Sequence, residues 1–195
     1  MNRAYKFRIY PTRKQEILIH KTFGCCRFVY NHMLADKKQA YEETKKTIKI
    51  TSAAYKKEYP WLKEVDSLAL ANEQLHLERA YRKFFKESKI GFPKFKSKHG
   101  SRKSYTTNVV NGNIWISEGK LRLPKTGTVK IRLHREIPAG WTLKSVTVSM
   151  DPSGKYYASL LFAFESCENQ AGTVREEKVL VLIMQCMGWQ SFLQE

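Results

Sequence analysis

A short segment of the chain combines lysines with aromatic residues in a pattern suited to nucleic-acid binding. Residues 91–98 read Gly-Phe-Pro-Lys-Phe-Lys-Ser-Lys. Lys94, Lys96 and Lys98 are two positions apart, so an extended backbone places their ammonium groups on one side, where they can follow a row of phosphates. Phe92 and Phe95 can stack on bases or anchor the segment to a core, and we favour the anchoring role. The pattern predicts a basic, phosphate-binding loop.

Other residues offer weaker signals of the same kind. Cations near predicted helix starts and within the loop are candidate phosphate contacts: Arg8, Arg13, Lys14, Arg27, Arg102 and Lys103. Tyr105 is followed by Thr106, Thr107 and Asn108, whose polar groups can read base edges or serve as ordinary strand residues. The two readings of this segment stay open at this point.

The residue types that hold metals or perform catalysis show no suitable spacing. Cys25, Cys26, Cys167 and Cys186 do not form the paired spacing of a structural zinc site, and we expect reduced thiols in a cytoplasmic protein. The five histidines show no metal-ligand spacing and no nearby C-x-x-C pair, and we interpret them as solvated or structural. We therefore predict no metal ligand and no catalytic residue.

The overall charge agrees with a polyanionic partner. The chain has 195 residues, with 35 Lys and Arg against 18 Asp and Glu, a net charge of +17. Such an excess favours nucleic acid. It is confined to residues 1–165, because residues 166–195 hold two basic and four acidic side chains. With 42% apolar residues and no apolar run of about 20, the composition predicts a globular protein without a membrane span.

The elements that must position these residues follow from periodicity. Residues 3–10 alternate as a strand that Pro11 ends, and Thr12 is a candidate helix N-cap. Apolar residues then recur at helical spacing to residue 41, with Gly24 predicted to separate two helices of a helix-turn-helix. A short helix at 53–59 ends at Pro60, and a longer one begins at Asp66 or Ser67.

Beyond the basic loop the period changes to two. We expect strands at residues 105–110, 113–117, 120–123, 128–134, 143–150 and 156–164, joined by turns at 111–112, 118–119, 126–127 and 153–154. Six short strands favour a small barrel of oligonucleotide-binding type. The strand at 3–10 is too isolated to be stable alone, so it should join this barrel and leave the helices as an insertion.

The predicted fold class is therefore α+β, with a helical, helix-turn-helix-like lobe inserted into a small β-barrel. We divide the chain into a first barrel strand at 1–10, the helical lobe with its basic loop at 11–103, the barrel at 104–166, and a tail at 167–195.

Several motifs, taken in order, are more specific than any of these patterns. They are Tyr-Lys-Phe-Arg-Ile-Tyr-Pro at 5–11, Phe-Gly-Cys-Cys-Arg-Phe-Val-Tyr-Asn at 23–31, Trp-Leu at 61–62, Val-Asp-Ser at 65–67, Ala-Tyr-Arg-Lys-Phe-Phe at 80–85 and Gly-Phe-Pro-Lys-Phe-Lys at 91–96. Ser-Tyr-Thr-Thr at 104–107, Leu-Arg-Leu-Pro at 121–124 and Val-Lys-Ile-Arg at 129–132 continue the series. Over residues 1 to about 165 the sequence resembles TnpB, the OrfB-type protein of bacterial insertion sequences.

The resemblance implies a transposon-encoded, RNA-guided DNA endonuclease. Its helical lobe and wedge barrel together would hold a guide RNA and a short transposon-adjacent DNA motif. By the same resemblance, Ser67, Ala71, Asn72 and Thr107 would face that motif. The family's nuclease uses Mg²⁺ held by carboxylates and a structural zinc, and neither cofactor is expected in this chain.

The expected start of that nuclease is altered here. The corresponding strand, residues 179–184, carries no aspartate. Back-translation of residues 182–192 in a shifted frame permits a string that resembles the family's first nuclease motif, so we expect the tail to be frameshifted and the nuclease to be missing. The predicted function is binding of guide RNA and DNA without cleavage. A nuclease subunit completed in trans and a generic basic RNA-binding module are the alternatives.

Overall fold

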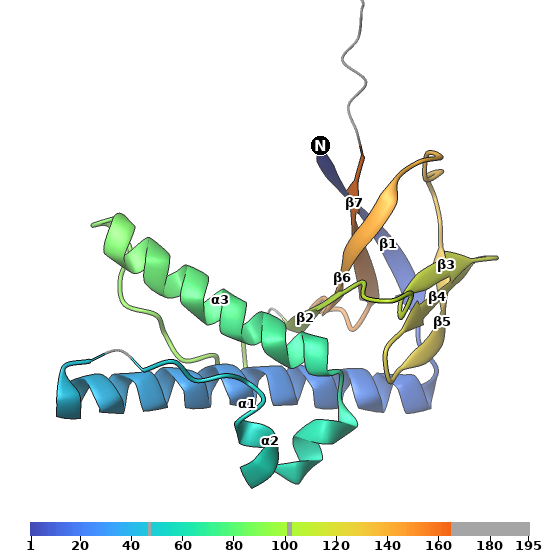
Figure 1. The fold of residues 1–195 in the computed structure, drawn as a ribbon. Helices are drawn as coiled ribbons and strands as arrows, with labels where there is room; N and C mark the ends of the chain where they lie inside the picture. Colours follow the sequence, from blue (N-terminus) through green and yellow to red (C-terminus); the bar gives the residue numbers. More distant parts are fainter. Residues whose placement is uncertain (47, 101–102, 165–195) are drawn as a thin grey trace, which may run out of the picture. The chain divides into compact units, whose positions relative to one another are not determined.

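The computed structural model describes residues 1–46, 48–100 and 103–164, of which residues 2–164 form one compact unit (Figure 1). The predicted tail at 167–195, with Cys167 and Cys186, lies outside the described residues, as does Arg102. The account below concerns the unit of residues 2–164.

Seven antiparallel strands form one curled sheet in the order β2-β6-β7-β1-β5-β4-β3. The strands are β1 (Asn2–Tyr10), β2 (Lys103–Asn108), β3 (Trp115–Ser117), β4 (Lys120–Leu123), β5 (Gly127–Arg132), β6 (Thr142–Met150) and β7 (Tyr156–Ala163). The alternating sequence produces alternating burial, since Phe7 and Ile9 are buried while Lys6 and Arg8 are exposed. Every predicted strand is present, with bounds shifted by a few residues.

The isolated first strand joins the later strands, as predicted, and it lies in the middle of the sheet order. Residues 2–9 of β1 pair with β7, and residues 8–10 pair with β5 on the other side. Its backbone groups are therefore bonded across both edges, which a lone strand cannot achieve. The first and last described strands in the sequence, β1 and β7, are thus neighbours in the sheet.

Two of the predicted turns have the positive φ angles that their sequences favour. The φ angles of Asn111 and Gly112 are 49° and 68°, and those of Glu118 and Gly119 are 48° and 68°. The Glu118-Gly119 turn joins the paired strands β3 and β4, and two successive positive φ values there match the twist of an antiparallel pair. The Asn111-Gly112 turn leads from β2 to β3, which lie at opposite ends of the strand order and do not pair.

In chain order, the helical residues come between β1 and β2 (Figure 1). Helix α1 (Arg13–Thr44) begins at Thr12, which forms a capping box with Gln15. It continues through Gly24, so the predicted break between two helices is wrong. Phe23, Cys25 and Cys26 are buried around this glycine, and their packing offsets the roughly 1 kcal/mol that a helical glycine costs.

Two short helices and one long helix follow. Helix α2 (Tyr55–Glu58) is shorter than predicted, and Pro60 opens a 3₁₀ helix, η1 (Pro60–Glu64), as well as ending α2. Helix α3 (Ser67–Lys86) is capped by Asp66, whose carboxylate accepts a 3.0 Å hydrogen bond from Leu68 N. Helix α3 packs against both α1 and β2.

The fold class is α+β, but the sheet is an open, curled half-barrel and not a closed barrel. In the described part of the chain, β2 pairs only with β6 and β3 only with β4. With just three residues, β3 offers few backbone groups for closing the ring. Across the described ranges, none of the helices combines the length and apolar character that a membrane crossing requires.

Candidate nucleic-acid interface

The basic loop between α3 and β2 is fastened to α1 through its backbone. Asn31, on α1, donates from Nδ2 to the carbonyl oxygen of Lys96 at 3.0 Å and accepts from Lys96 N at 2.8 Å. A side-chain amide that uses both its donor and its acceptor on one residue holds an extended segment as a neighbouring strand would. The loop therefore has a fixed attachment point at Lys96.

The side chain of Lys96 strengthens that attachment. Its ammonium group is hydrogen-bonded to Oε2 of Glu73, whose side chain is only 1% exposed, and lies 4.3 Å from the ring centroid of Tyr30. His76 Nδ1 is 3.4 Å from the other oxygen of Glu73. A buried carboxylate needs such partners, because burial without them is costly. Lys96, predicted to contact phosphate, thus serves first as an internal ion-pair partner.

Beside this attachment lies a hollow of about 410 Å³ with a strongly basic lining. Arg27 comes from α1, Lys96 and Lys98 from the loop, and Lys103 from the start of β2. Its other lining residues are apolar or small and polar: Phe23, Cys26, Ser97, Gly100 and Ser104. None of the described residues that line it is acidic, and although Lys96 is paired with Glu73, the other three cations concentrate positive charge around the cavity.

A second hollow, of about 430 Å³, adjoins the first and shares Lys98, Gly100 and Lys103 with it. Asp151 is its acidic member. The Asp151 carboxylate accepts from the hydroxyl of Ser153 at 2.8 Å and from Lys155 N at 2.9 Å. These hydrogen bonds, led by that of Ser153, lower the pKa of Asp151. Lys98 and Lys103 therefore line both hollows.

The loop lysines that flank Lys96 are available to a ligand. Lys94 and Lys98 are exposed, and among the described residues neither side chain forms an ion pair or hydrogen bond. The two aromatic residues of the loop differ in their contacts: Phe92 packs on two rings of α3 but is 44% exposed, so it does not anchor the loop in the core, and Phe95 is 57% exposed. The loop presents cations outward while Lys96 holds it inward.

The residues expected to face a DNA motif occupy a different setting. Asn72 is buried and donates from Nδ2 to the carbonyl oxygens of Leu68 and Thr106, both at 2.9 Å. Thr107 is fully buried and donates its hydroxyl to the Asp66 carboxylate. Asn72 and Thr107 are therefore buried and connect α3 to β2, whereas the resemblance implied that they face a DNA motif.

Three further residues near Asn72 and Thr107 in the sequence differ in exposure. Tyr105 is buried, with its ring 5.8 Å from that of Phe23. Ser67 is exposed and accepts a 2.7 Å hydrogen bond from Lys56 Nζ, and Ala71 is half-buried. Of the four residues assigned to the motif, only Ser67 is exposed.

The remaining predicted cations lie away from the hollow's lining. Arg8 is exposed on β1 with its guanidinium 5.0 Å from the ring centroid of Tyr10. Arg13 and Lys14 are exposed in the first turn of α1, and Arg13 pairs with Glu16 at 3.5 Å. Of the predicted contacts, the structure brings together Arg27, Lys96, Lys98 and Lys103.

Comparison of the sequence with known proteins shows which family the chain resembles. The chain is 38% identical over 172 residues to a "Putative RNA-guided DNA endonuclease" of Streptomyces pristinaespiralis, covering 83% of this chain and 41% of that protein. It is 33% identical over 166 residues to "Putative RNA-guided DNA endonuclease InsQ" of Escherichia coli (strain K12), covering 80% and 39%. Virulence protein VsdF of Salmonella dublin is 40% identical over 115 residues, with coverage of 51% of this chain and 97% of VsdF. Residues 1–46 match a family model described as a helix-turn-helix domain.

The chain belongs to the TnpB family of OrfB-type insertion-sequence proteins. It spans about two fifths of the length of the two endonuclease relatives. The segment matched by the helix-turn-helix model contains β1 and the single helix α1. In this TnpB-family chain, then, the region carries one long helix that supplies Arg27 to the basic hollow and Asn31 to the attachment of the loop.

The buried cysteines of the TnpB-family sequence agree with the predicted reduced thiols. Cys25 and Cys26 are free and buried on α1. Burial raises the pKa of Cys25 to about 11 and that of Cys26 well above its usual range. Within the described ranges, no three His, Cys, Asp or Glu side chains are grouped as a metal site.

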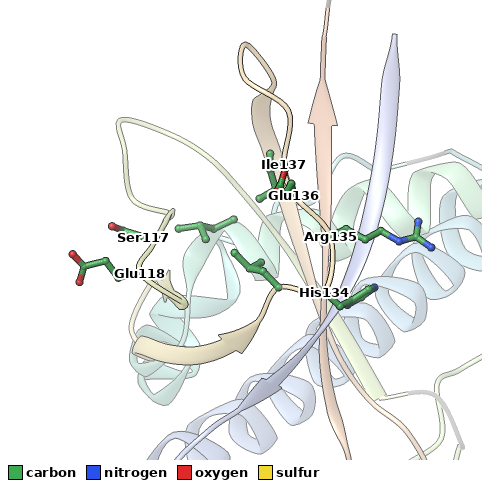
Figure 2. A pocket seen from close by; sticks show the side chains of 8 residues that line it. Ser117, Glu118, His134, Arg135, Glu136 and Ile137 are labelled. Carbon is green, nitrogen blue, oxygen red and sulfur yellow. The ribbon is translucent and has the colours of Figure 1, made fainter.

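A larger hollow, of about 750 Å³, lies between the β3–β4 turn and the segment after β5 (Figure 2). Sequence patterns did not indicate it. Its lining mixes charges, with Glu118 and Glu136 beside His134 and Arg135. The His134 ring lies 5.1 Å from that of Phe7, and the Arg135 guanidinium lies 6.0 Å from the ring centroid of Tyr5. This balance of charge makes it a poor phosphate site compared with the basic hollow.

Proposed function

We propose that this TnpB-family chain binds a guide RNA and a short transposon-adjacent DNA motif, with the basic hollow between α1, the loop and β2 as its phosphate-binding centre. The observation that carries the proposal is the convergence of Arg27, Lys98 and Lys103 from three separate elements on one cavity. Cations from separate elements repel one another unless a polyanion neutralises them. The names of the two endonuclease relatives supply the RNA and DNA.

Phosphate binding has a direct signature in salt dependence. The logarithm of the binding constant falls linearly with the logarithm of the salt concentration. Each phosphate contact makes that slope steeper by about 0.7 to 0.9. Changing Arg27, Lys98 and Lys103 singly to Ala should reduce the slope by about that amount per contact, measured by fluorescence anisotropy with a labelled RNA. Lys38→Ala is the matched control, because Lys38 is an exposed lysine of α1 that pairs with Glu42 outside the hollow. Slopes that stay unchanged in the three variants would refute the assignment.

The identity of the RNA needs a separate experiment. RNA that co-purifies with the chain should be dominated by one transposon-end transcript if it is a guide. A heterogeneous mixture would instead support the alternative of a generic basic RNA-binding module. Both outcomes can be read from sequencing the bound RNA, with the Arg27→Ala variant as a control for retention through the basic hollow.

Recognition of the DNA motif would involve the amino-terminal end of α3. Ser67 is exposed there, while Asp66, Asn72 and Thr107 fix the helix against β2. Ser67→Ala should therefore weaken discrimination between motif and non-motif DNA and leave folding unchanged. Competition binding with the two DNAs measures this, and equal discrimination by wild type and variant would remove Ser67 from the proposal.

Cleavage is expected to be absent from this chain alone. The sequence basis is that residues 179–184, which by resemblance correspond to the start of the family's nuclease motif, contain no aspartate. A plasmid carrying the target and motif, incubated with Mg²⁺, guide RNA and the purified chain, should remain supercoiled. Cutting by the chain alone would contradict this expectation, and cutting only after addition of a second polypeptide would support completion in trans.

A further inference from the structure

Four aromatic residues gather at the carboxyl end of α3, at a distance along the helix from its capped start. Tyr81, Phe84 and Phe85 belong to the last turns of α3, and Phe92 comes from the basic loop. The ring centroids of Tyr81 and Phe85 are 6.4 Å apart with planes at 20°, and those of Phe84 and Phe85 are 5.2 Å apart. We call these four residues the α3-end cluster.

Three members of the cluster have evident structural partners. Phe92 meets Tyr81 and Phe84 edge to face, at 5.6 and 5.5 Å, and so ties the loop to α3. The ammonium group of Lys37, on α1, lies 5.5 Å from the Tyr81 ring centroid. These contacts explain why Tyr81, Phe84 and Phe92 are aromatic.

Phe85 is not explained in this way, because its side chain is 78% exposed. Among large apolar residues of the described chain its exposure is the highest, above Met1 at 75% and Ile17 at 60%. Phenylalanine is a poorer helix former than the Lys or Glu that suit an exposed site, so helix formation does not favour it there. Its ring lies nearly parallel to Tyr81 and is open to a further flat partner.

The charge around Phe85 indicates which partner fits. Residues 79–98 contain eight basic side chains and one acidic side chain. A ring on such a surface suits a polyanion with flat, apolar faces, which describes the bases of a single-stranded nucleic acid. An apolar protein surface would have to bury several of these lysines and arginines without partners, at a considerable cost.

We propose that Phe85 stacks on an unpaired base of a bound single strand, extending the Tyr81–Phe85 stack by one ring. The inference rests on the proposed nucleic-acid binding and adds a second contact site to the basic hollow. Stacking is tolerant of base identity because every base has a π face. The site should therefore prefer single strands over blunt duplexes without selecting a sequence.

The test compares Phe85→Ala with Phe85→Trp and with Ile17→Ala as the matched control, an exposed apolar residue of α1 outside the cluster. Affinity for a single-stranded oligonucleotide containing 2-aminopurine is measured by anisotropy, and stacking by quenching of that base's fluorescence. Phe85→Ala should weaken binding about 5- to 100-fold with an unchanged salt slope and should abolish the quenching. Phe85→Trp and Ile17→Ala should retain both.

Three results would overturn the proposal, and the first two are distinct from failure of the proposed function. Equal affinity and quenching in wild type and Phe85→Ala, with weakened binding in Lys98→Ala, would remove only the stacking site. A wild type that sediments as a dimer while Phe85→Ala is monomeric would assign the ring to a second copy of the chain. If wild type binds no nucleic acid at low salt, both the inference and the proposed function fail together.

Discussion

The ion pair between Lys96 and Glu73 leads to a quantitative prediction for Lys96→Met, which keeps an unbranched stem beside Tyr30 and removes the charge. Removing one partner of a buried pair costs about 3–5 kcal/mol when the remaining charge is left uncompensated. Here the side chain of Lys96 is 40% exposed, and His76 stands 3.4 Å from the other oxygen of Glu73. Solvent and the imidazole therefore offset part of the loss, and we expect the free energy of unfolding to fall by about 2 kcal/mol.

Urea unfolding followed by circular dichroism measures this change, and a double-mutant cycle isolates its cause. Glu73→Gln removes the buried charge, so Lys96→Met should cost much less in the Glu73→Gln background, with a coupling energy of at least about 1 kcal/mol. The exposed pair of Lys38 and Glu42 is the matched control, and its coupling should stay below about 0.5 kcal/mol. A coupling between Lys96 and Glu73 no larger than this control would refute the internal role of Lys96.

Three further changes test other parts of the structure. Gly24→Ala should raise the free energy of unfolding by about 0.5–1 kcal/mol, because a Cβ there meets nothing within 4 Å, and a lower melting temperature would argue against a continuous α1. Asp66→Ala should lower it by about 1–2 kcal/mol and Asp66→Asn by less, since only Asn can still cap α3; equal losses would exclude the cap. Cys25 should resist iodoacetamide at pH 8 in the folded chain, as read by mass spectrometry, because its pKa is about 11. Labelling of the native chain at pH 8 would contradict the burial of Cys25. Because folding raises this pKa, the contribution of Cys25 to the free energy of unfolding is complete below about pH 8.5 and is lost as the pH rises toward 11.

The strands and helix starts could be predicted from the sequence because their signals are local. Alternation in residues 3–10, paired positive-φ residues in the turns, and Thr12 and Asp66 before helical periods each depend on a few neighbouring side chains. The same reasoning wrongly predicted a helix break at Gly24. Its helix-breaking tendency is worth only about 1 kcal/mol, which the burial of Phe23 and Cys26 on the same helix outweighs.

The roles of the polar residues could not be predicted, because they depend on contacts between distant parts of the chain. Lys96 has the spacing of a phosphate contact but bonds to Glu73, 23 residues away in sequence. Thr107 looks like a base-reading strand residue but bonds to Asp66, 41 residues away. A pattern of alternating lysines specifies which side chains share one side of an extended segment, and only the fold decides which of them finds an internal carboxylate.

These internal bonds also bear on how the basic hollow binds its ligand. Asn31 and Glu73 hold the loop at Lys96, and Asp66 holds β2 against α3 through Thr107, so the elements that carry Arg27, Lys98 and Lys103 are fixed before any ligand arrives. Ordering a flexible loop on binding would subtract from affinity, whereas a loop already fixed loses little conformational entropy. On the proposed function, the buried polar residues of α1 and α3 would contribute to binding without touching the nucleic acid, because they position the elements that carry the three cations.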